Sequence, residues 1–208
     1  LSLLLEERPR PSTRNGKLRI LAVGRLVRKK GFDVFVDACG ILKRRGVAFE
    51  ALIVGPGDKN EIEHETEIKR RIAKHQLDAH LRLVGPLSQK ALFEEYHHAS
   101  IFCLPCRVLE DGDRDGIPNV LTEAMACGLP VVSTAVSGIP EIVTDNVNGL
   151  LVAPNDPEAL ADALLCLHRD PVLAQRFSSS ARKIVRERFD GERFARRLAD
   201  LFQAATQA

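Results

Sequence analysis

The sequence lacks an excess of charge of either sign. Its 30 lysines and arginines stand against 28 aspartates and glutamates, which gives a formal net charge of +2. A surface that binds nucleic acid would be strongly basic, so we expect no nucleic acid among the partners. The sequence also lacks any apolar run near the ~20 residues that a membrane-spanning helix needs.

Cysteine and methionine are scarce. The 5 cysteines are odd in number and scattered, unlike the disulfide framework of a secreted protein. With no signal-peptide features at the start, we expect a cytoplasmic protein. The pair Cys103 and Cys106 has redox spacing but ends a strand-like run, whereas a redox pair begins a helix; a second ligand pair for zinc is not evident. The lone methionine is Met125, which suggests a processed chain or a piece of a longer one.

Apolar residues make up 45% of the chain, enough for a full core. Short apolar runs alternate with segments whose apolar residues recur at helical spacing. This alternation predicts an α/β fold: a Rossmann-like, doubly wound parallel sheet of about six strands with helices on both faces. The expected strands lie in 17–24, 48–55, 81–85, 100–105, 129–134 and 149–154. The expected divisions are a linker at 1–16, a domain at 17–190 and a last helix at 191–208.

Ligands of such sheets bind beyond the carboxyl ends of the strands. After the first expected strand comes GRLVRKKG, in which Arg25 and Lys30 suit an anionic ligand, most simply a diphosphate. Gly24 and Gly31 let the backbone come close to that ligand. The alternative is that these cations belong to a solvated turn.

A helix start follows the fourth expected strand, in RDGIPNVLTEAMACGLPVVST. Pro118 suits the first helical position, where its missing N–H group costs nothing. The N–H groups of Asn119, Val120 and Leu121 would then be unpaired donors at the positive end of the helix dipole. Such a helix start is a second candidate anion site.

Two carboxylates flank that helix start. Glu123 is four residues past Asn119, on the same helical face, and leans toward the helix start. It can accept hydrogen bonds from the vicinal hydroxyls of a ribose, and Asp115 would lie near whatever the phosphates carry. The alternative is an ordinary exposed glutamate.

Three other motifs are incomplete or missing. DGDRDG (111–116) matches half of a calcium loop, but Thr122 stands where the bidentate glutamate belongs. VGPGDKN has Asn60 in place of the third glycine of a dinucleotide fingerprint, which disfavours an NAD-type oxidoreductase. No G-x-S-x-G elbow supplies a hydrolase nucleophile.

Several ordered segments together resemble one family: GRLVRKKGFD, VGPL, DGIPNVLTEAMACGLPVVST, SGIPEIV and NGLLVAPNDPEALADAL. They resemble the C-terminal, donor-binding domain of retaining glycosyltransferases of the two-Rossmann-domain (GT-B) type, called group 1 or family 4. The resemblance runs from about Leu18 to the C-terminus. The hallmark is two acidic residues separated by seven, here Asp115 and Glu123. The family usually has glutamate first, so Asp115 is one methylene shorter.

The resemblance implies that a sugar passes, with retention, from a nucleoside-diphosphate sugar to an acceptor, in polysaccharide or glycolipid synthesis. By resemblance, Glu123 would hold the ribose, Asp115 would accept a hydrogen bond from a sugar hydroxyl, and Arg25 and Lys30 would neutralise the diphosphate. No metal or other cofactor is expected. The implied backbone contacts to sugar and phosphate come from Gly116, Ile117, Asn119, Val120 and Leu121. The implied lining of the base comes from Val84, Gly85, Pro86 and Leu87.

The resemblance also implies a partner, because the family's full enzyme has an N-terminal domain that binds the acceptor. Residues 1–16 would be a remnant of that domain, and 191–208 would pack toward it. Membrane contact, peripheral to the inner face, would come only through that domain, and this chain alone would be inactive. The alternative is a non-catalytic module that binds a nucleotide or a sugar phosphate. An acceptor domain encoded upstream would separate the two.

Overall fold

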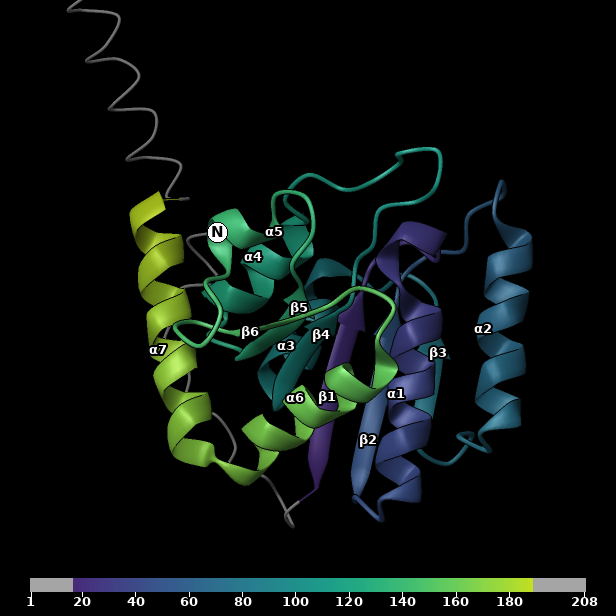
Figure 1. Cartoon of the computed structure of the whole chain (residues 1–208), viewed down its shortest axis with the longest axis horizontal. Helices are drawn as coiled ribbons and strands as arrows, with labels where there is room; N and C mark the ends of the chain where they lie inside the picture. Colours follow the sequence, from purple (N-terminus) through teal and green to yellow (C-terminus); the bar gives the residue numbers. More distant parts are fainter. Residues whose placement is uncertain (1–16, 189–208) are drawn as a thin grey trace, which may run out of the picture.

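The computed structural model describes residues 17–188, which form a six-stranded parallel sheet with helices on both faces (Figure 1). The strands are β1 (Leu18–Val23), β2 (Phe49–Val54), β3 (Leu81–Val84), β4 (Ile101–Leu104), β5 (Val131–Thr134) and β6 (Leu150–Val152). The helices are η3 (Arg28–Lys30, a 3-10 turn), α1 (Phe32–Arg44), α2 (Ile62–Lys74), α3 (Gln89–His98), α4 (Asn119–Ala126), α5 (Ile139–Ile142), α6 (Pro157–Arg169) and α7 (Pro171–Arg188).

All six expected strands are present, and the predicted fold class is confirmed. The central strands β4 and β5 are buried on both faces, as their unbroken apolar runs predicted. The short helix α5 was not expected from the sequence. The helix expected at 191–208 lies outside the described residues, and the proposed domain bounds stay a prediction.

The strand order is β3-β2-β1-β4-β5-β6, and every pairing is parallel. The order reverses between β1 and β4, because the chain winds outward from β1 in one direction and from β4 in the other. Open α/β sheets bind ligands in the crevice beyond such a reversal. The loops that meet there are 24–31 after β1 and 105–118 after β4.

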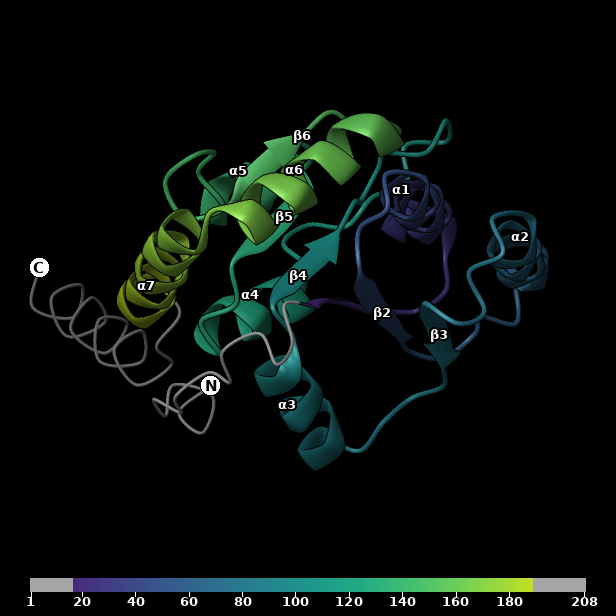
Figure 2. The same cartoon turned by 90° about the horizontal axis from the view of Figure 1, so that it is seen from below.

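The helices form two layers. Figure 2 shows α1, α2 and α6 on one face of the sheet and α3 and α4 on the other. Side-chain oxygens cap the first turns of α3 and α6: Ser88 Oγ accepts a hydrogen bond from the Ala91 N–H group at 3.3 Å, and Asp156 Oδ1 accepts one from the Ala159 N–H group at 2.9 Å. Helix α7 packs against α4, where Ser178 Oγ donates to the Gly128 carbonyl at 2.5 Å.

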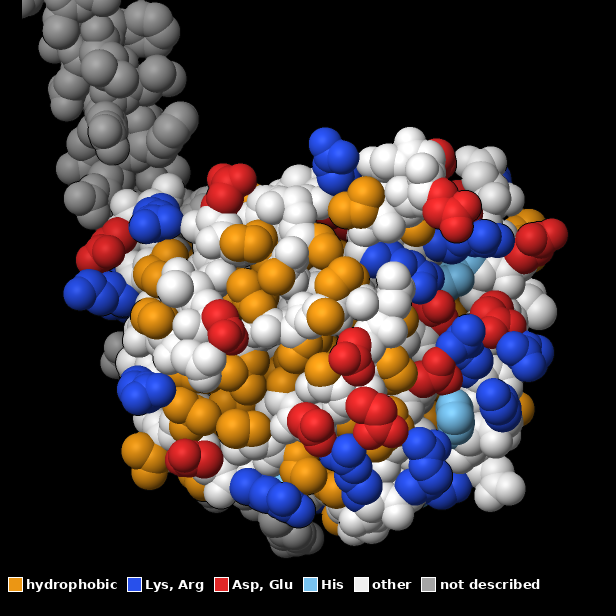
Figure 3. All heavy atoms as spheres, in the orientation of Figure 1, with side chains coloured by type: hydrophobic (Ala, Val, Ile, Leu, Met, Phe, Trp, Pro, Cys, Tyr) orange, Lys and Arg blue, Asp and Glu red, His pale blue; other side chains and the backbone are white. Residues whose placement is uncertain are grey.

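The face of the molecule seen in Figure 3 divides by polarity. In Figure 3 hydrophobic side chains gather where α5, α6 and β6 lie, while charged side chains and histidines dominate over α1 and α2. Within residues 17–188 no helix combines the length and the apolar character that a membrane crossing requires. The cytoplasmic location stays a prediction.

Candidate functional site

The loop after β1 brings Lys30 into the crevice. The turn η3 ends at Gly31, whose φ of 68° lies in the left-handed region. A Cβ at Gly31 would lie 2.0 Å from the Pro105 carbonyl oxygen, so this loop touches the loop after β4 directly. A Cβ at Gly24 would lie 3.3 Å from Lys30 Cε, so that glycine leaves room for the lysine stem.

Lys30 and Asp115 form an ion pair across the crevice. Lys30 Nζ lies 2.9 Å from Asp115 Oδ2, and the side chains are only 11% and 21% exposed. The thiol of Cys106 donates a weak hydrogen bond to the same carboxylate oxygen at 3.8 Å. The structure therefore brings two predicted site residues together, and their charges neutralise each other.

Arg25 lies in the same loop but has a different partner. Its guanidinium is 2.9 Å from Asp58 Oδ2, in the loop after β2, and its side chain is 59% exposed. Asp58 lies in VGPGDKN, the segment that fails as a dinucleotide fingerprint. No local pattern pairs Asp58 with Arg25, because 33 residues separate them in the chain.

Glu123 is half-buried on α4, and its partner is Tyr96 of α3. The Tyr96 hydroxyl donates to Glu123 Oε2 at 3.0 Å and lies 3.3 Å from the Val120 carbonyl oxygen. Tyr96 is fully buried, and burial, together with the Glu123 charge, raises the pKa of its phenol well above the usual range. Sequence reasoning missed Tyr96. The available signal was that it is the chain's one tyrosine, within the polar helix QKALFEEYHH.

The start of α4 corrects two expectations. The helix begins at Asn119, so Pro118 is the capping residue and not the first helical one. The Leu121 N–H group donates to the Pro118 carbonyl at 2.9 Å, so the prediction that it is unpaired is wrong. The first turn tightens to an i→i−3 bond, which is common at helix ends. Asn119 and Val120 lie in that first turn, with Asn119 exposed.

The remaining predicted residues lie on either side of this core. Gly116 is exposed and Ile117 half-buried, and both approach Gly138, whose added Cβ would lie 2.9 Å from Ile117 Cγ1. The predicted base-lining residues, Val84 to Leu87, lie at the carboxyl end of edge strand β3. Val84 is half-buried, whereas Gly85, Pro86 and Leu87 are exposed.

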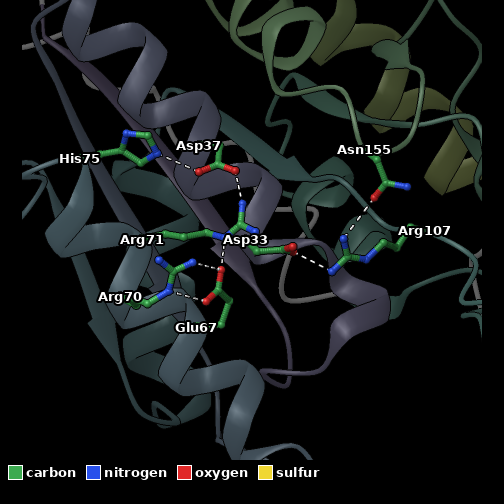
Figure 4. Close-up of polar contacts among 8 residues, drawn as sticks. All are labelled: Asp33, Asp37, Glu67, Arg70, Arg71, His75, Arg107 and Asn155. Carbon is green, nitrogen blue, oxygen red and sulfur yellow. Dashed lines mark hydrogen bonds and ion pairs between the residues drawn. The ribbon is translucent and has the colours of Figure 1, made fainter.

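Arg107 is a second residue that sequence reasoning missed (Figure 4). It lies in the loop after β4, and its side chain is 17% exposed. Its guanidinium donates to Asp33 Oδ1 and the Arg28 carbonyl, both at 2.8 Å, and to Asn155 Oδ1 at 3.1 Å. The backbone N–H group of Arg107 donates a hydrogen bond to the Lys29 carbonyl oxygen at 2.9 Å. Arg107 thus fastens the loop after β4 to η3, to the first turn of α1 and to the segment before α6.

A separate polar network joins α1 to α2 on the outer face (Figure 4). Asp37 of α1 forms an ion pair with Arg71, and its Oδ1 atom lies 2.8 Å from His75 Nε2. Glu67 pairs with Arg70 and Arg71 at 2.7 Å each, and these two arginines hold the pKa of its carboxyl at about 2. This network fixes the two helices to each other and contains no predicted site residue.

The redox alternative finds no support at Cys103 and Cys106. Both thiols are buried, and burial raises the pKa of Cys106 to about 12 and that of Cys103 well above its ordinary value. A redox pair needs the opposite shift, because the thiolate is the reactive form.

The calcium alternative finds no support in the loop after β4. Asp113 pairs with Lys29 at 2.9 Å, just as Asp115 pairs with Lys30. Within 17–188 no group of three or more metal-binding side chains is gathered. That binding needs no metal stays a prediction.

Two surface hollows lie outside the crevice, one near it and one at the amino-terminal ends of β1, β2 and β3. One, of about 990 Å³, lies between the loops after β2 and β4, where Arg28 and Arg107 line it. The other, of about 360 Å³, lies between α3 and the sheet, next to Leu52 and His80. Neither of the two is lined by a predicted site residue. In the crevice itself, the Lys30–Asp115 ion pair joins the loop after β1 to the loop after β4.

The strand order and the charged crevice at its reversal define a Rossmann-like α/β domain. A model of the family described as "Glycosyl transferases group 1" matches residues 5–184, and the chain belongs to this family. The family resemblance seen in the sequence is thereby confirmed.

Named relatives agree with this family. The amylovoran biosynthesis glycosyltransferase AmsK of Erwinia amylovora is 41% identical over 186 residues, which cover 89% of this chain and 44% of that protein. The putative colanic acid biosynthesis glycosyltransferase WcaL of Escherichia coli K12 is 38% identical over 188 residues, covering 90% and 45%. The chain therefore spans about half the length of these relatives.

A solved structure with the same fold is that of HepE from Anabaena in complex with UDP and glucose. It superimposes with a TM-score of 0.80 at 22% identity, over 90% of this chain and 48% of that chain. At this identity the likeness shows the fold alone.

Proposed function

We propose that this chain is the donor-binding half of a retaining glycosyltransferase that moves a sugar from a nucleoside-diphosphate sugar to an acceptor. The observation that carries the proposal is the meeting of Lys30, Asp115 and the start of α4 at the reversal of the strand order. A cation and a helix start bind phosphate there. Glu123, one turn into α4, is placed to accept hydrogen bonds from the ribose.

The chemistry assigned to these residues is electrostatic. As the nucleoside diphosphate leaves, negative charge grows on it, and Lys30 and Arg25 neutralise that charge. The sugar passes through a cation-like state. The diphosphate replaces Asp115 as the partner of Lys30, and Asp115 then accepts a hydrogen bond from a sugar hydroxyl. Positioning and fixed charges supply most of the rate enhancement in such a site. Asn119, Val120, Gly116 and Ile117 offer backbone contacts to the phosphates and sugar.

The biological setting is proposed from the relatives. The two named relatives act in amylovoran and putatively in colanic acid biosynthesis, which supports a role in polysaccharide synthesis. The partner that we propose is an acceptor-binding domain in the other half of the protein. Support comes from the fact that this chain covers only 44% and 45% of those relatives.

The Glu123→Ala variant tests donor binding. Losing a hydrogen bond to a charged group costs about 1.5–3 kcal/mol, so nucleotide affinity should fall roughly ten- to a hundredfold. Calorimetry with UDP, GDP and ADP on both proteins measures the change. The matched control is Glu158→Ala, which removes an exposed glutamate from α6 on the opposite face of the sheet and should leave affinity unchanged.

Two results would contradict this assignment. If Glu123→Ala bound the nucleotide as tightly as the parent chain does, Glu123 would not be the residue that binds the ribose. The same titration with EDTA should be unchanged, because the proposed site binds the diphosphate through cations and N–H groups. Loss of nucleotide binding in EDTA would instead indicate that binding depends on a metal ion held by the carboxylates of Asp111, Asp113 and Asp115.

The 208-residue chain should transfer no sugar by itself. Catalysis requires donor and acceptor to be held at reaction distance, and the proposal gives this chain only the donor. Transfer assays with nucleotide sugars should therefore show activity only when the chain is joined to its acceptor-binding half. Transfer by the purified chain, lost in Lys30→Ala, would show that the second domain is dispensable.

A further inference from the structure

We propose that Tyr96 is a positioning residue that holds the Glu123 carboxylate in the orientation that reads the ribose. This inference rests on the proposed function of Glu123. It adds a residue that the sequence motifs leave out and that touches neither phosphate nor sugar in our assignment.

The phenol of Tyr96 is fixed from all sides. The side chain is fully buried, and its ring lies 5.9 Å from the Phe102 ring of β4, between centroids. A tyrosine has one proton to donate. Of the two acceptors in reach, the Glu123 carboxylate at 3.0 Å is nearer than the Val120 carbonyl at 3.3 Å, and a charged acceptor gives the stronger bond.

That bond engages one carboxylate oxygen and leaves the other for a ligand. A glutamate side chain has three rotatable bonds, so a carboxylate without a buried partner would sample several directions. Tyr96 restricts it to one. The side chain of Glu123 therefore loses its conformational entropy when the protein folds and not when the nucleotide binds. Such preorganisation raises the affinity for the nucleotide.

The position of Tyr96 in the chain gives the bond a second consequence. Tyr96 belongs to α3, which follows β3 and the residues 84–87 that we assign to the base. Glu123 belongs to α4, which follows the loop that we assign to phosphate and sugar. The Tyr96–Glu123 bond therefore ties the base side of the proposed site to its ribose side.

A purely structural role for the hydroxyl predicts a different result from a positioning role. Either role predicts lower stability for Tyr96→Phe, because the half-buried Glu123 carboxylate loses its hydrogen-bond donor. Only positioning would change how well the site distinguishes a ribose from a deoxyribose. The selectivity ratio is therefore the decisive measurement.

The experiment compares UDP, GDP and ADP with their 2′-deoxy counterparts by calorimetry on the 208-residue chain. In Tyr96→Phe we expect affinity for the ribonucleotide that binds to fall about three- to tenfold, as expected for one hydrogen bond. Affinity for its 2′-deoxy counterpart should change less, so the ratio of the two shrinks.

Ser178→Ala is the matched control, since it removes another buried hydroxyl, which donates to the Gly128 carbonyl just beyond the C-terminal end of α4. It should lower stability and leave the ratio unchanged. If Tyr96→Phe kept the parent chain's ratio of ribonucleotide to 2′-deoxynucleotide affinity while Glu123→Ala reduced it, the inference would be overturned and the proposed function would stand. If Glu123→Ala also kept the parent ratio, both would be overturned.

Discussion

Replacing Arg107 with alanine is expected to lower the free energy of unfolding by about 3–5 kcal/mol, the range for breaking a buried ion pair from one side. The variant leaves the Asp33 carboxylate, whose side chain is 11% exposed, without its cation. It also removes the donors to the Arg28 carbonyl and to Asn155. Urea unfolding followed by circular dichroism measures the loss.

Two further variants show whether the loss comes from this geometry. Arg70→Ala removes an arginine whose side chain is 63% exposed and pairs with Glu67, and it should change the free energy of unfolding little, because water screens exposed ion pairs. Arg107→Lys keeps the charge but lacks the planar fork that reaches three acceptors, so it should recover only part of the stability. If Arg107→Ala cost no more than Arg70→Ala, the junction at Arg107 would not stabilise the loops.

Gly31→Ala is expected to be similarly damaging, for a steric reason. An alanine at the observed φ of 68° is strained by about 1–2 kcal/mol, as for any L-residue in the left-handed region. Its Cβ would also lie 2.0 Å from the Pro105 carbonyl oxygen. Because that atom is backbone, it cannot rotate away, and overpacking adds roughly 1–3 kcal/mol. The total loss should be roughly 2–5 kcal/mol in urea unfolding.

Gly46 offers a close control. Its φ is 71°, and a Cβ there would meet nothing within 4 Å. Gly46→Ala should therefore show the backbone strain alone, about 1–2 kcal/mol. Equal losses in the two variants would mean that the contact between Gly31 and Pro105 relaxes without cost. We also expect only Gly31→Ala to weaken nucleotide binding, because Lys30 is the neighbouring residue.

The sequence predicted those features that depend on neighbours in the chain. Unbroken apolar runs located the strands, because strands such as β4 and β5 are buried on both faces. The two loops at the crevice followed from the rule that ligands bind beyond the carboxyl ends of parallel strands. The fold class was therefore accessible from the sequence, whereas the site and the roles given to its residues stay predictions.

Contacts between distant segments were not accessible in this way. Arg107 and Asp33 are 74 residues apart, and Tyr96 and Glu123 are 27 apart. Neither pair follows a helical or strand period, so only the packing of the layers brings them together. The pairing of Lys30 with Asp115 was missed for a related reason: 85 residues separate them in the sequence, and each was assigned to a ligand and not to the other. The prediction that the Leu121 N–H group is unpaired was wrong because the first turn of α4 tightens to an i→i−3 hydrogen bond.

The neighbouring lysines of η3 reach the loop after β4 at two alternate aspartates, Asp113 from Lys29 and Asp115 from Lys30. An anion that took Lys30 from Asp115 would leave the Lys29–Asp113 pair and the Arg107–Lys29 backbone bond in place. The exchange would then need only side-chain rotation. Rotation of a side chain takes roughly picoseconds to nanoseconds, whereas loop movement extends to microseconds. Entry of a ligand should therefore not wait for the loop to open.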